Sequence, residues 1–583
     1  MHTAKQITAW LQLTRLFLKQ FLENDLVSPD SDRAQLLAIV GSLVVSLTLF
    51  VSMFLSATYA MSVLTPGEAA IRTLNDKFFY VSLAMLVTGL VAAAQWDALS
   101  LDHRDSAILD PLPVRPALVR VAKLTAVAIL GAAVALAVNA FPAVVFPWML
   151  SFSLRQMHTG DVFWLVAIHF MITVTAAVFG YLAVMAARES LCAALGPRLF
   201  ARVSPACQAA TIVVLGSLLL LLPPASTRVS QRGFSGWWKQ SPPMAFVATY
   251  EIATRGFLAD LPRRPMTERM ARRDRSNTAA YEALVPLFLP MARRVETLLA
   301  GTAVLLAAAT LISAVRAPIG GALLVAGGRR RLRIGERLAN TLIVRHPAAR
   351  AGFHFAVATL FRSKTHRLTL ACSAAAGLAM AMVVLSRIEL QPGSLTPGVL
   401  VIQPLLYGSL LVGFRHLVRI PAELRANWGV QLAWRDQPRQ FRGGVFRAGI
   451  LTLALPAVML VVPFVALVGD TSIALMHAAI GLAGAIVFLE ALMVGYDKAP
   501  FTCNYVPSSG RGFLPIFGIA FFVGANLFAR LQLSMLQGRG AVTGAMVLLA
   551  LFGVLRAASI ARRDPRVDFN EGPEGLNQLG LHN

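Results

Sequence analysis

Long apolar runs recur along the whole chain, and they constrain its fold more than any other feature of the sequence. Each run has about 20 residues, enough for a helix to cross the roughly 30 Å of hydrocarbon in a bilayer. A helix satisfies its own backbone hydrogen bonds in lipid, whereas a barrel would need alternating strands of about ten residues. We therefore predict twelve membrane-spanning helices. They lie near residues 34–58, 78–95, 123–150, 162–187, 207–224, 295–316, 368–387, 398–416, 447–468, 474–496, 512–529 and 541–556.

The composition agrees with this prediction. Of the 583 residues, 56% are hydrophobic and 14% are charged, whereas soluble globular chains carry about 25% charged residues. So few charges cannot cover that much apolar surface in water. The predicted fold class is therefore all-α, a polytopic integral membrane protein. The same numbers exclude a disordered chain, a collagen-like repeat and a disulfide-rich secreted scaffold.

Charge and cysteine content exclude further classes. The net charge is +24, and basic residues in membrane proteins gather in cytoplasmic loops and near anionic head groups. No basic tract is interleaved with aromatic residues, so we expect no nucleic-acid partner. No two cysteines have the C-x-x-C spacing, so the sequence predicts neither a metal cluster nor a disulfide framework. The cysteines are Cys192, Cys207, Cys372 and Cys503.

Loop charges predict the orientation. Segment 317–367 carries ten Lys and Arg residues against Glu336 alone, so we expect it to be cytoplasmic. Counting six spans each way places both termini in the cytoplasm, and we expect no cleavable signal peptide. Segment 225–294 falls outside despite about a dozen basic residues, because long translocated loops largely escape the charge rule. The alternative is a missed or extra span near 205–225, which would invert everything upstream.

The layout of the two halves predicts an internal repeat. Each half opens with a basic, amphipathic, Phe-bearing stretch, at 10–21 and at 353–362, and continues with two spans, a cytoplasmic loop and four more spans. The corresponding loops are 95–122 and 417–446. Such halves would face each other with a pathway between them. The predicted parts are an interfacial segment 1–33, a first half 34–316, a basic linker with an interfacial helix 317–367, a second half 368–556 and a polar tail 557–583.

A search for catalytic motifs finds none. The chain lacks G-x-x-x-x-G-K-[ST], H-E-x-x-H, G-x-S-x-G and a G-x-G-x-x-G ahead of a helix. We therefore expect no ATP binding by this chain itself, no enzymatic activity, no metal site and no cofactor. Three ionisable residues inside predicted spans are candidates for lining a pathway. For His169 and His477, the commoner role of a lone intramembrane histidine is that of a helix–helix hydrogen-bond partner. Glu490 is as readily an ion-pairing or snorkelling residue.

The most informative segment is the predicted cytoplasmic loop after the second span. A charged cluster, Asp102-His103-Arg104-Asp105, gives way to the turn Leu112-Pro113-Val114-Arg115-Pro116. This resembles the coupling segment of type-2 ABC exporter permeases, in which a short charged helix runs into a Leu-Pro-Val-type turn. The resemblance implies that the loop docks on a separate ATPase subunit. It assigns docking to Asp102, Arg104, Asp105, Leu112, Pro113 and Arg115.

The sequence departs from that family in two places. The usual Glu followed by Gly-Thr is replaced by Asp105-Ser106-Ala107, and the second loop, at 419–428, keeps a proline and charges but lacks the Leu-Pro-Val turn. A second reading of the first loop is an ordinary connection whose prolines break helices.

These features predict the membrane subunit of an ABC-type exporter in the bacterial cytoplasmic (inner) membrane, with an ATPase subunit and membrane lipids as partners. The alternative is a twelve-helix secondary transporter driven by an ion gradient, which usually needs buried ionisable groups. A membrane enzyme acting on lipid would need clustered His, Asp or Glu at a membrane face, and the sequence contains no such cluster.

Cysteine accessibility tests the predicted topology. In a background with the four native cysteines replaced by serine, Asn340→Cys should be labelled only from the cytoplasmic side and Asp260→Cys only from outside. Labelling of both from one side would contradict the twelve-span order and leave an odd number of spans in the first half.

Overall fold

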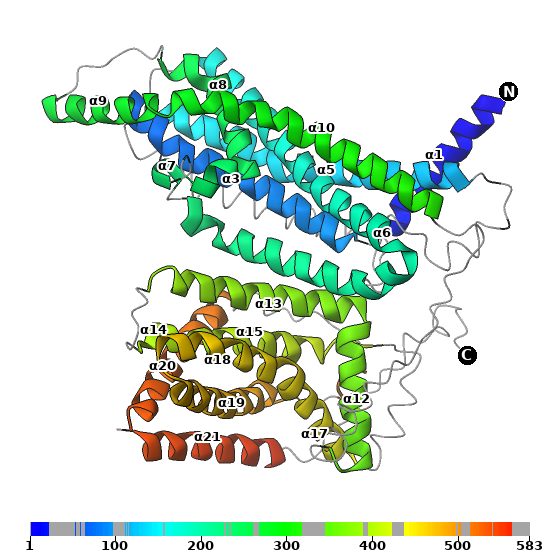
Figure 1. Cartoon of the computed structure of the whole chain (residues 1–583), viewed down its shortest axis with the longest axis vertical. Coiled ribbons are helices and arrows are strands. Elements are labelled where there is room, and N and C mark those ends of the chain that lie inside the picture. The colour runs from blue at the N-terminus through cyan, green and yellow to red at the C-terminus, as the bar shows by residue number, and fades with distance from the viewer. Residues whose placement is uncertain are drawn as a thin grey trace, which may run out of the picture. The chain divides into compact units, whose positions relative to one another are not determined.

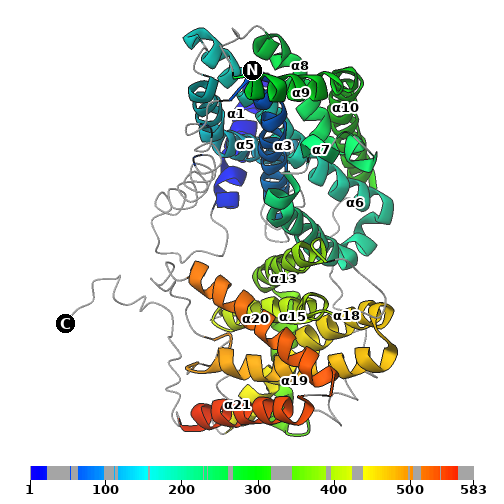
Figure 2. The same cartoon turned by 90° about the vertical axis from the view of Figure 1, so that its left-hand side faces the viewer.

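The computed structural model describes 2–22, 53, 59, 64–96, 111, 114, 116–154, 158–226, 229–232, 234, 236–259, 267–316, 344–388, 395–422, 437–496, 499–502, 514–538 and 540–561. These residues are helical or lie in turns, with no strand among them. The chain divides into two compact units, Met1–Ala326 and Gly327–Asn583. Figures 1 and 2 draw the first unit in blue to green and the second in light green to red. The boundary falls within the predicted linker.

Ten helices of the described part are long and apolar enough to cross a membrane. Every predicted span from 78–95 onward overlaps one of them, and two predicted spans share a single helix. Span 34–58 lies outside the described residues except for Met53. The all-α prediction and its membrane-crossing helices are confirmed at this level, and the number twelve stays a prediction.

The described part of the first unit contains five long helices. They are α1 (His2–Leu22), α3 (Pro66–Ala94), α5 (Pro116–Leu154), α6 (Thr159–Ser226) and α10 (Val285–Arg316). The predicted spans 162–187 and 207–224 both lie in α6, which bends at Gly196. There φ is +71°, a value that glycine adopts readily because it has no Cβ. The glycine therefore separates two arms that are each long enough to be a span.

Four shorter elements form the predicted outer loop. They are α7 (Val229–Arg232), the 3-10 turn η1 (Gly236–Gln240), α8 (Pro242–Ala259) and α9 (Glu268–Glu282). Helix α8 packs against α3, α6 and α10, and α9 packs against α3. The side chains of Met244 to Ala248 are at most 3% exposed. The loop is therefore part of the core of this unit.

The described part of the second unit is also a bundle of helices. Its elements are α12 (Pro347–Arg362), α13 (Lys364–Leu385), α14 (Pro397–Leu400), α15 (Ile402–Leu417), α17 (Pro438–Gly449), the π-helical turn η4 (Ile450–Ala454), α18 (Leu455–Val468), α19 (Thr471–Met493), α20 (Leu514–Leu536) and α21 (Ala541–Ala561). Helices α17 to α18 form one continuous apolar stretch. The π turn ends two residues before Pro456, which has no backbone N–H to donate.

Among the described helices long enough to cross a membrane, the one that contains the predicted second span is the most buried in each unit. In the most apolar window of Pro66–Ala94, 67% of residues are buried, and the value for Pro397–Leu417 is 72%. The corresponding values are 11% for α10 and 6% for α21. Span two is therefore the central helix of each bundle, while α10 and α21 present most of their apolar surface outward.

A repeated tetrapeptide marks the start of both central helices. Leu-Thr-Pro-Gly occurs at 64–67, where α3 begins, and again at 395–398, where α14 begins. In both places the threonine is the extended N-cap and the proline is in the first turn. Proline is favoured there because its φ is already helical and its missing N–H would have no helical partner.

In each unit the amphipathic opening helix contacts the helix in which predicted span three begins. Phe17 of α1 packs on Val119 and Ala122, in the first turns of α5. Helix α12 packs on α17, so closely that a Cβ on Gly352 would lie 2.2 Å from the Phe441 carbonyl oxygen. In each unit the opening helix is packed against the start of predicted span three. This correspondence supports the predicted duplication, whose full six-plus-six form stays a prediction.

Helices α3 and α6 approach closely at Gly180, which generates a test of the packing. A Cβ on Gly180 would lie 2.4 Å from the Met85 carbonyl oxygen, whereas one on Gly301 of α10 would meet nothing within 4 Å. Gly180→Ala should destabilise the protein in detergent by about 1–3 kcal/mol, because overpacking forces backbones apart. The control, Gly301→Ala, should be neutral or slightly stabilising. Equal melting temperatures for the two variants would contradict the close approach.

Candidate functional site

The residues predicted to dock an ATPase are not placed by the structure. Asp102, Arg104, Asp105, Leu112, Pro113 and Arg115 all lie outside the described residues. Their docking role stays a prediction. Both flanks of the loop are described, however, because α3 ends at Ala94 and α5 begins at Pro116.

The end of α3 is held by side chains from both arms of α6. Gln208 Nε2 donates to the Ala93 carbonyl oxygen at 2.9 Å, and Trp96 Nε1 donates to Ser204 Oγ at 2.8 Å. The Tyr181 hydroxyl lies 2.9 Å from Gln95 Oε1. Trp96 and Gln208 are 3% and 1% exposed. The chain therefore enters the predicted docking loop from a fixed point.

The chain also leaves the loop at a fixed point. Val114, in the Leu-Pro-Val turn, packs against the apolar cluster that Phe17 of α1 forms with Val119 and Ala122 of α5. The Lys123 ammonium lies 5.1 Å from the centre of the Phe17 ring, a favourable cation–π distance. The start of α5 and the amphipathic α1 thus form one packed unit.

A buried ion pair lies near the middle of α3. Lys77 Nζ is 2.6 Å from Glu251 Oε1 of α8, and the two side chains are 3% and 0% exposed. Lys77 Nζ also donates to Thr254 Oγ1 at 3.4 Å and lies 4.6 Å from the centre of the Tyr250 ring. Each of these contacts joins the central helix to the predicted outer loop.

The second oxygen of Glu251 is occupied as well. The Tyr281 hydroxyl of α9 donates to Glu251 Oε2 at 2.5 Å. Burial raises the pKa of the Tyr281 phenol above its usual value, and the negative charge of Glu251 raises it further. The phenol therefore stays protonated and can act as a donor. Glu251 links α3, α8 and α9 through one carboxylate.

His169, one of the predicted pathway residues, belongs to this cluster. It lies on the first arm of α6, is fully buried, and its Nδ1 is 3.0 Å from the Tyr250 hydroxyl. Within the part of the chain that the structure describes, its Nε2 has no hydrogen-bond partner. The rings of Tyr80 and Phe146 lie 5.3 Å from the imidazole, centre to centre. His169 therefore joins a span to α8, as its helix–helix reading predicts.

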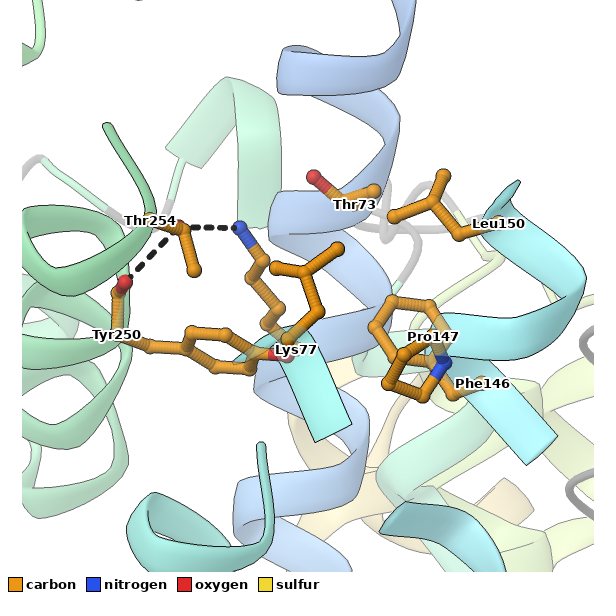
Figure 3. A pocket seen from close by; sticks show the side chains of 8 residues that line it. Thr73, Lys77, Phe146, Pro147, Leu150, Tyr250 and Thr254 are labelled. Atoms are coloured by element: carbon orange, nitrogen blue, oxygen red, sulfur yellow. Dashed lines mark hydrogen bonds between the residues drawn. The ribbon is translucent and has the colours of Figure 1, made fainter. Parts of the chain in front are cut away.

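The cavity beside Lys77 is small. Its volume is about 10 Å³, about the minimum for one water molecule. Figure 3 shows the Lys77 ammonium reaching toward Thr254, with the Tyr250 ring beside it and Phe146 and Pro147 across the cavity. Its lining consists of Thr73, Lys77, Phe146, Pro147, Leu150, Leu165, Tyr250 and Thr254. The cavity therefore has room for no more than about one water molecule.

The other two predicted pathway residues lie in the second unit, on α19. His477 is fully buried, and neither of its ring nitrogens has a hydrogen-bond partner among the described residues. Its backbone carbonyl oxygen accepts a bond from Gln403 Nε2 at 3.4 Å, and Gln403 Oε1 accepts one from Gln532 Nε2 at 3.1 Å. His477 thus lies in a neutral polar layer between α15, α19 and α20.

Glu490 forms an ion pair. Its Oε1 is 3.1 Å from Arg556 Nη1 of α21, and the two side chains are 10% and 52% exposed. The pair ties the least buried helix of the second unit to α19. Glu490 is thirteen residues after His477, about 20 Å along a helix, so the structure does not bring the two into one site.

Lys77 and Glu251 do not belong to a recognised sequence motif. Lys77 immediately precedes the predicted span 78–95, and Glu251 is the single acidic residue in the apolar stretch 242–259. Those positions could have marked each residue as unusual. Their pairing could not be derived, because they are 174 positions apart.

Among the described residues, no group of three or more His, Cys, Asp or Glu side chains could hold a metal ion. Comparison of the chain with family models, curated proteins and solved structures finds no match.

The buried ion pair makes a stability prediction. Lys77→Met should leave Glu251 buried without a cation and destabilise the protein by about 3–5 kcal/mol, measured as a lower melting temperature in detergent. The double variant Lys77→Met/Glu251→Leu should recover part of the loss, because it removes both charges. Arg272→Ala breaks an exposed pair with Glu268 and should cost less than about 1 kcal/mol. A Lys77→Met protein as stable as Arg272→Ala would contradict this account.

Proposed function

We propose that the chain is the membrane-spanning permease subunit of an ABC-type exporter. Both halves are fused in one chain, and a separate subunit binds and hydrolyses ATP. The chain resides in the bacterial inner membrane with both termini in the cytoplasm. The observation that carries this proposal is the fixing of both flanks of the predicted coupling loop to the helices of the first unit.

That fixing matters because a coupling loop has to pass movement to membrane helices. Before the loop, Trp96 and the end of α3 are hydrogen-bonded to the second arm of α6. After it, Val114 and the start of α5 pack with α1. A partner that displaces the loop therefore acts on α3, α5 and α6 together. An ordinary connection between two helices needs no such anchoring on both sides.

Two further features support the proposal. The sequence contains no nucleotide-binding motif, so the energy for export comes from a partner. The opening helices α1 and α12 each contact the helix that begins predicted span three, α5 and α17, as two permease halves descended from one ancestor would. Transport then proceeds by alternating access between the two halves.

A specific observation also favours the ion-gradient alternative. The sequence suggested few buried ionisable groups, whereas Lys77 and Glu251 form a buried pair at the central helix, and such pairs occur in secondary transporters. The pair is well satisfied, since Glu251 also accepts from Tyr281 and Lys77 also donates to Thr254. A static tie between helices accounts for these contacts, so we keep the permease as the first proposal. Uptake driven by a proton or sodium gradient in proteoliposomes without ATP would favour the alternative.

The docking role is tested by removing charges from the loop. Arg104→Ala/Asp105→Ala should leave the protein inserted, because neither residue lies in a predicted span. If the charges are paired in the interface, it should weaken the contact with the ATPase subunit by about 2 kcal/mol or more, which is roughly thirtyfold or more in affinity. The measurement is the amount of ATPase subunit retained on tagged protein from native membranes.

The matched control is Glu268→Ala/Arg272→Ala. It also removes one acidic and one basic side chain, here from an exposed pair on α9, and should retain the ATPase subunit fully. Equal retention by both double variants would show that loop 95–122 is not the docking site.

A further inference from the structure

We propose that Tyr181 and Tyr496 are positioning residues that transmit movement of the two cytoplasmic loops to span four of each unit. The inference rests on the proposed function and deepens it. It starts from a contact that occurs twice. In each unit a tyrosine from the predicted fourth span bonds, through its hydroxyl, to the residue that caps the C-terminus of the central helix.

In the first unit the tyrosine is Tyr181 on α6, and the capping residue is Gln95, at the end of α3. The hydroxyl lies 2.9 Å from Gln95 Oε1. It also lies 3.1 Å from the Val127 carbonyl oxygen of α5. Gln95 precedes the predicted docking segment and Val127 follows it. One side chain therefore contacts the helices on both flanks of the loop.

In the second unit the tyrosine is Tyr496, just after α19, and the capping residue is Val418, at the end of α15. The hydroxyl donates to the Val418 carbonyl oxygen at 2.8 Å, with the Ala499 carbonyl oxygen at 3.4 Å. Val418 is where the second predicted cytoplasmic loop, 417–446, begins. The two tyrosines are each 5% exposed, so water does not compete for their hydroxyls.

Both rings are held in place by their surroundings. A Cβ on Gly131 of α5 would lie 2.9 Å from the Tyr181 ring, so the glycine is what admits the ring. The Tyr496 ring carries the Arg415 guanidinium 4.6 Å from its centre, and Arg415 Nε donates to the Leu492 carbonyl oxygen at 2.7 Å. A ring confined in this way passes on a displacement instead of rotating away from it.

The hydroxyl chemistry makes the Tyr181 contact sensitive to relative movement of α3 and α5. A phenol has one proton, so it donates to one acceptor at a time, and two acceptors lie within reach. A shift of α3 against α5 changes which acceptor receives the proton and pulls on α6. His169 of the outer cluster is on the same arm of α6, twelve residues away, about 18 Å along the helix. That arm joins the loop to the outer cluster.

Single-hydroxyl variants test the inference. Tyr181→Phe and Tyr496→Phe each keep the ring and remove the bond. In complexes assembled with the ATPase subunit that co-purifies with the wild-type chain, each should lower the permease-dependent stimulation of ATP hydrolysis at least fivefold. Retention of the ATPase subunit and the melting temperature should stay near wild type. Gln95→Leu should behave like Tyr181→Phe, whereas Gln95→Glu, which still accepts a bond, should keep stimulation within twofold.

Tyr407→Phe is the control, because Tyr407 is a buried tyrosine of α15 that is away from both loops. Wild-type stimulation in both loop variants, or a loss of stimulation that follows the melting temperature, would overturn the inference while leaving the permease proposal intact. A loss at Tyr181 alone would support the first loop and overturn the second. If the wild-type chain retains no ATPase subunit, the proposed function fails and the inference fails with it.

Discussion

The first unit depends on the burial of the Lys77 ammonium in the central helix. A buried charge of this kind has to be paired inside the protein, because unpaired it would cost several kcal/mol. Glu251 of α8 supplies the counter-charge, with its Oε1 2.6 Å from Lys77 Nζ. The Tyr281 hydroxyl of α9 donates a hydrogen bond to the other carboxylate oxygen. The predicted outer loop is therefore drawn into the bundle, where α8 covers α3, α6 and α10. A loop that only capped the outer leaflet would leave Lys77 without a counter-charge.

Helix α3 connects this cluster to the other end of the unit. Lys77 and Gln95 are eighteen residues apart, roughly 27 Å along a helix, close to the thickness of the hydrocarbon. At the first residue, near the middle of α3, the helix is tied to the predicted outer loop, and at the second, at its C-terminal end, to both arms of α6. The Tyr181 hydroxyl of α6 also reaches α5. The central helix is thus held near its middle and at its C-terminal end, so a displacement at that end is passed toward the ion pair. The second unit has the same central position for α15 but a neutral layer of Gln403 and Gln532 in place of the ion pair.

Sequence patterns predict the helices well because hydrocarbon imposes a length and a composition on each span. They predict the bend in α6 less well, since nothing local distinguishes Gly196 from a glycine that stays helical. The tetrapeptide Leu-Thr-Pro-Gly occurs twice in the sequence, but four residues are too few to indicate a repeat. The structure gives them meaning, because both copies lie at the start of a central helix. The contacts of Lys77 with Glu251 and of Tyr181 with Gln95 join residues far apart in the chain, and only packing brings them together. The six predicted docking residues lie outside the described residues, so their proposed role rests on the sequence alone.

The central claim is that this chain works with a separate ATPase. The most direct measurement is to isolate the tagged wild-type chain from its native membranes in mild detergent and to identify stoichiometric partners by mass spectrometry. The account predicts a partner that carries the G-x-x-x-x-G-K-[ST] motif absent from this chain and that dissociates when loop 95–122 is altered. Isolation of the intact chain with no nucleotide-binding partner, together with transport driven by an ion gradient alone, would contradict it.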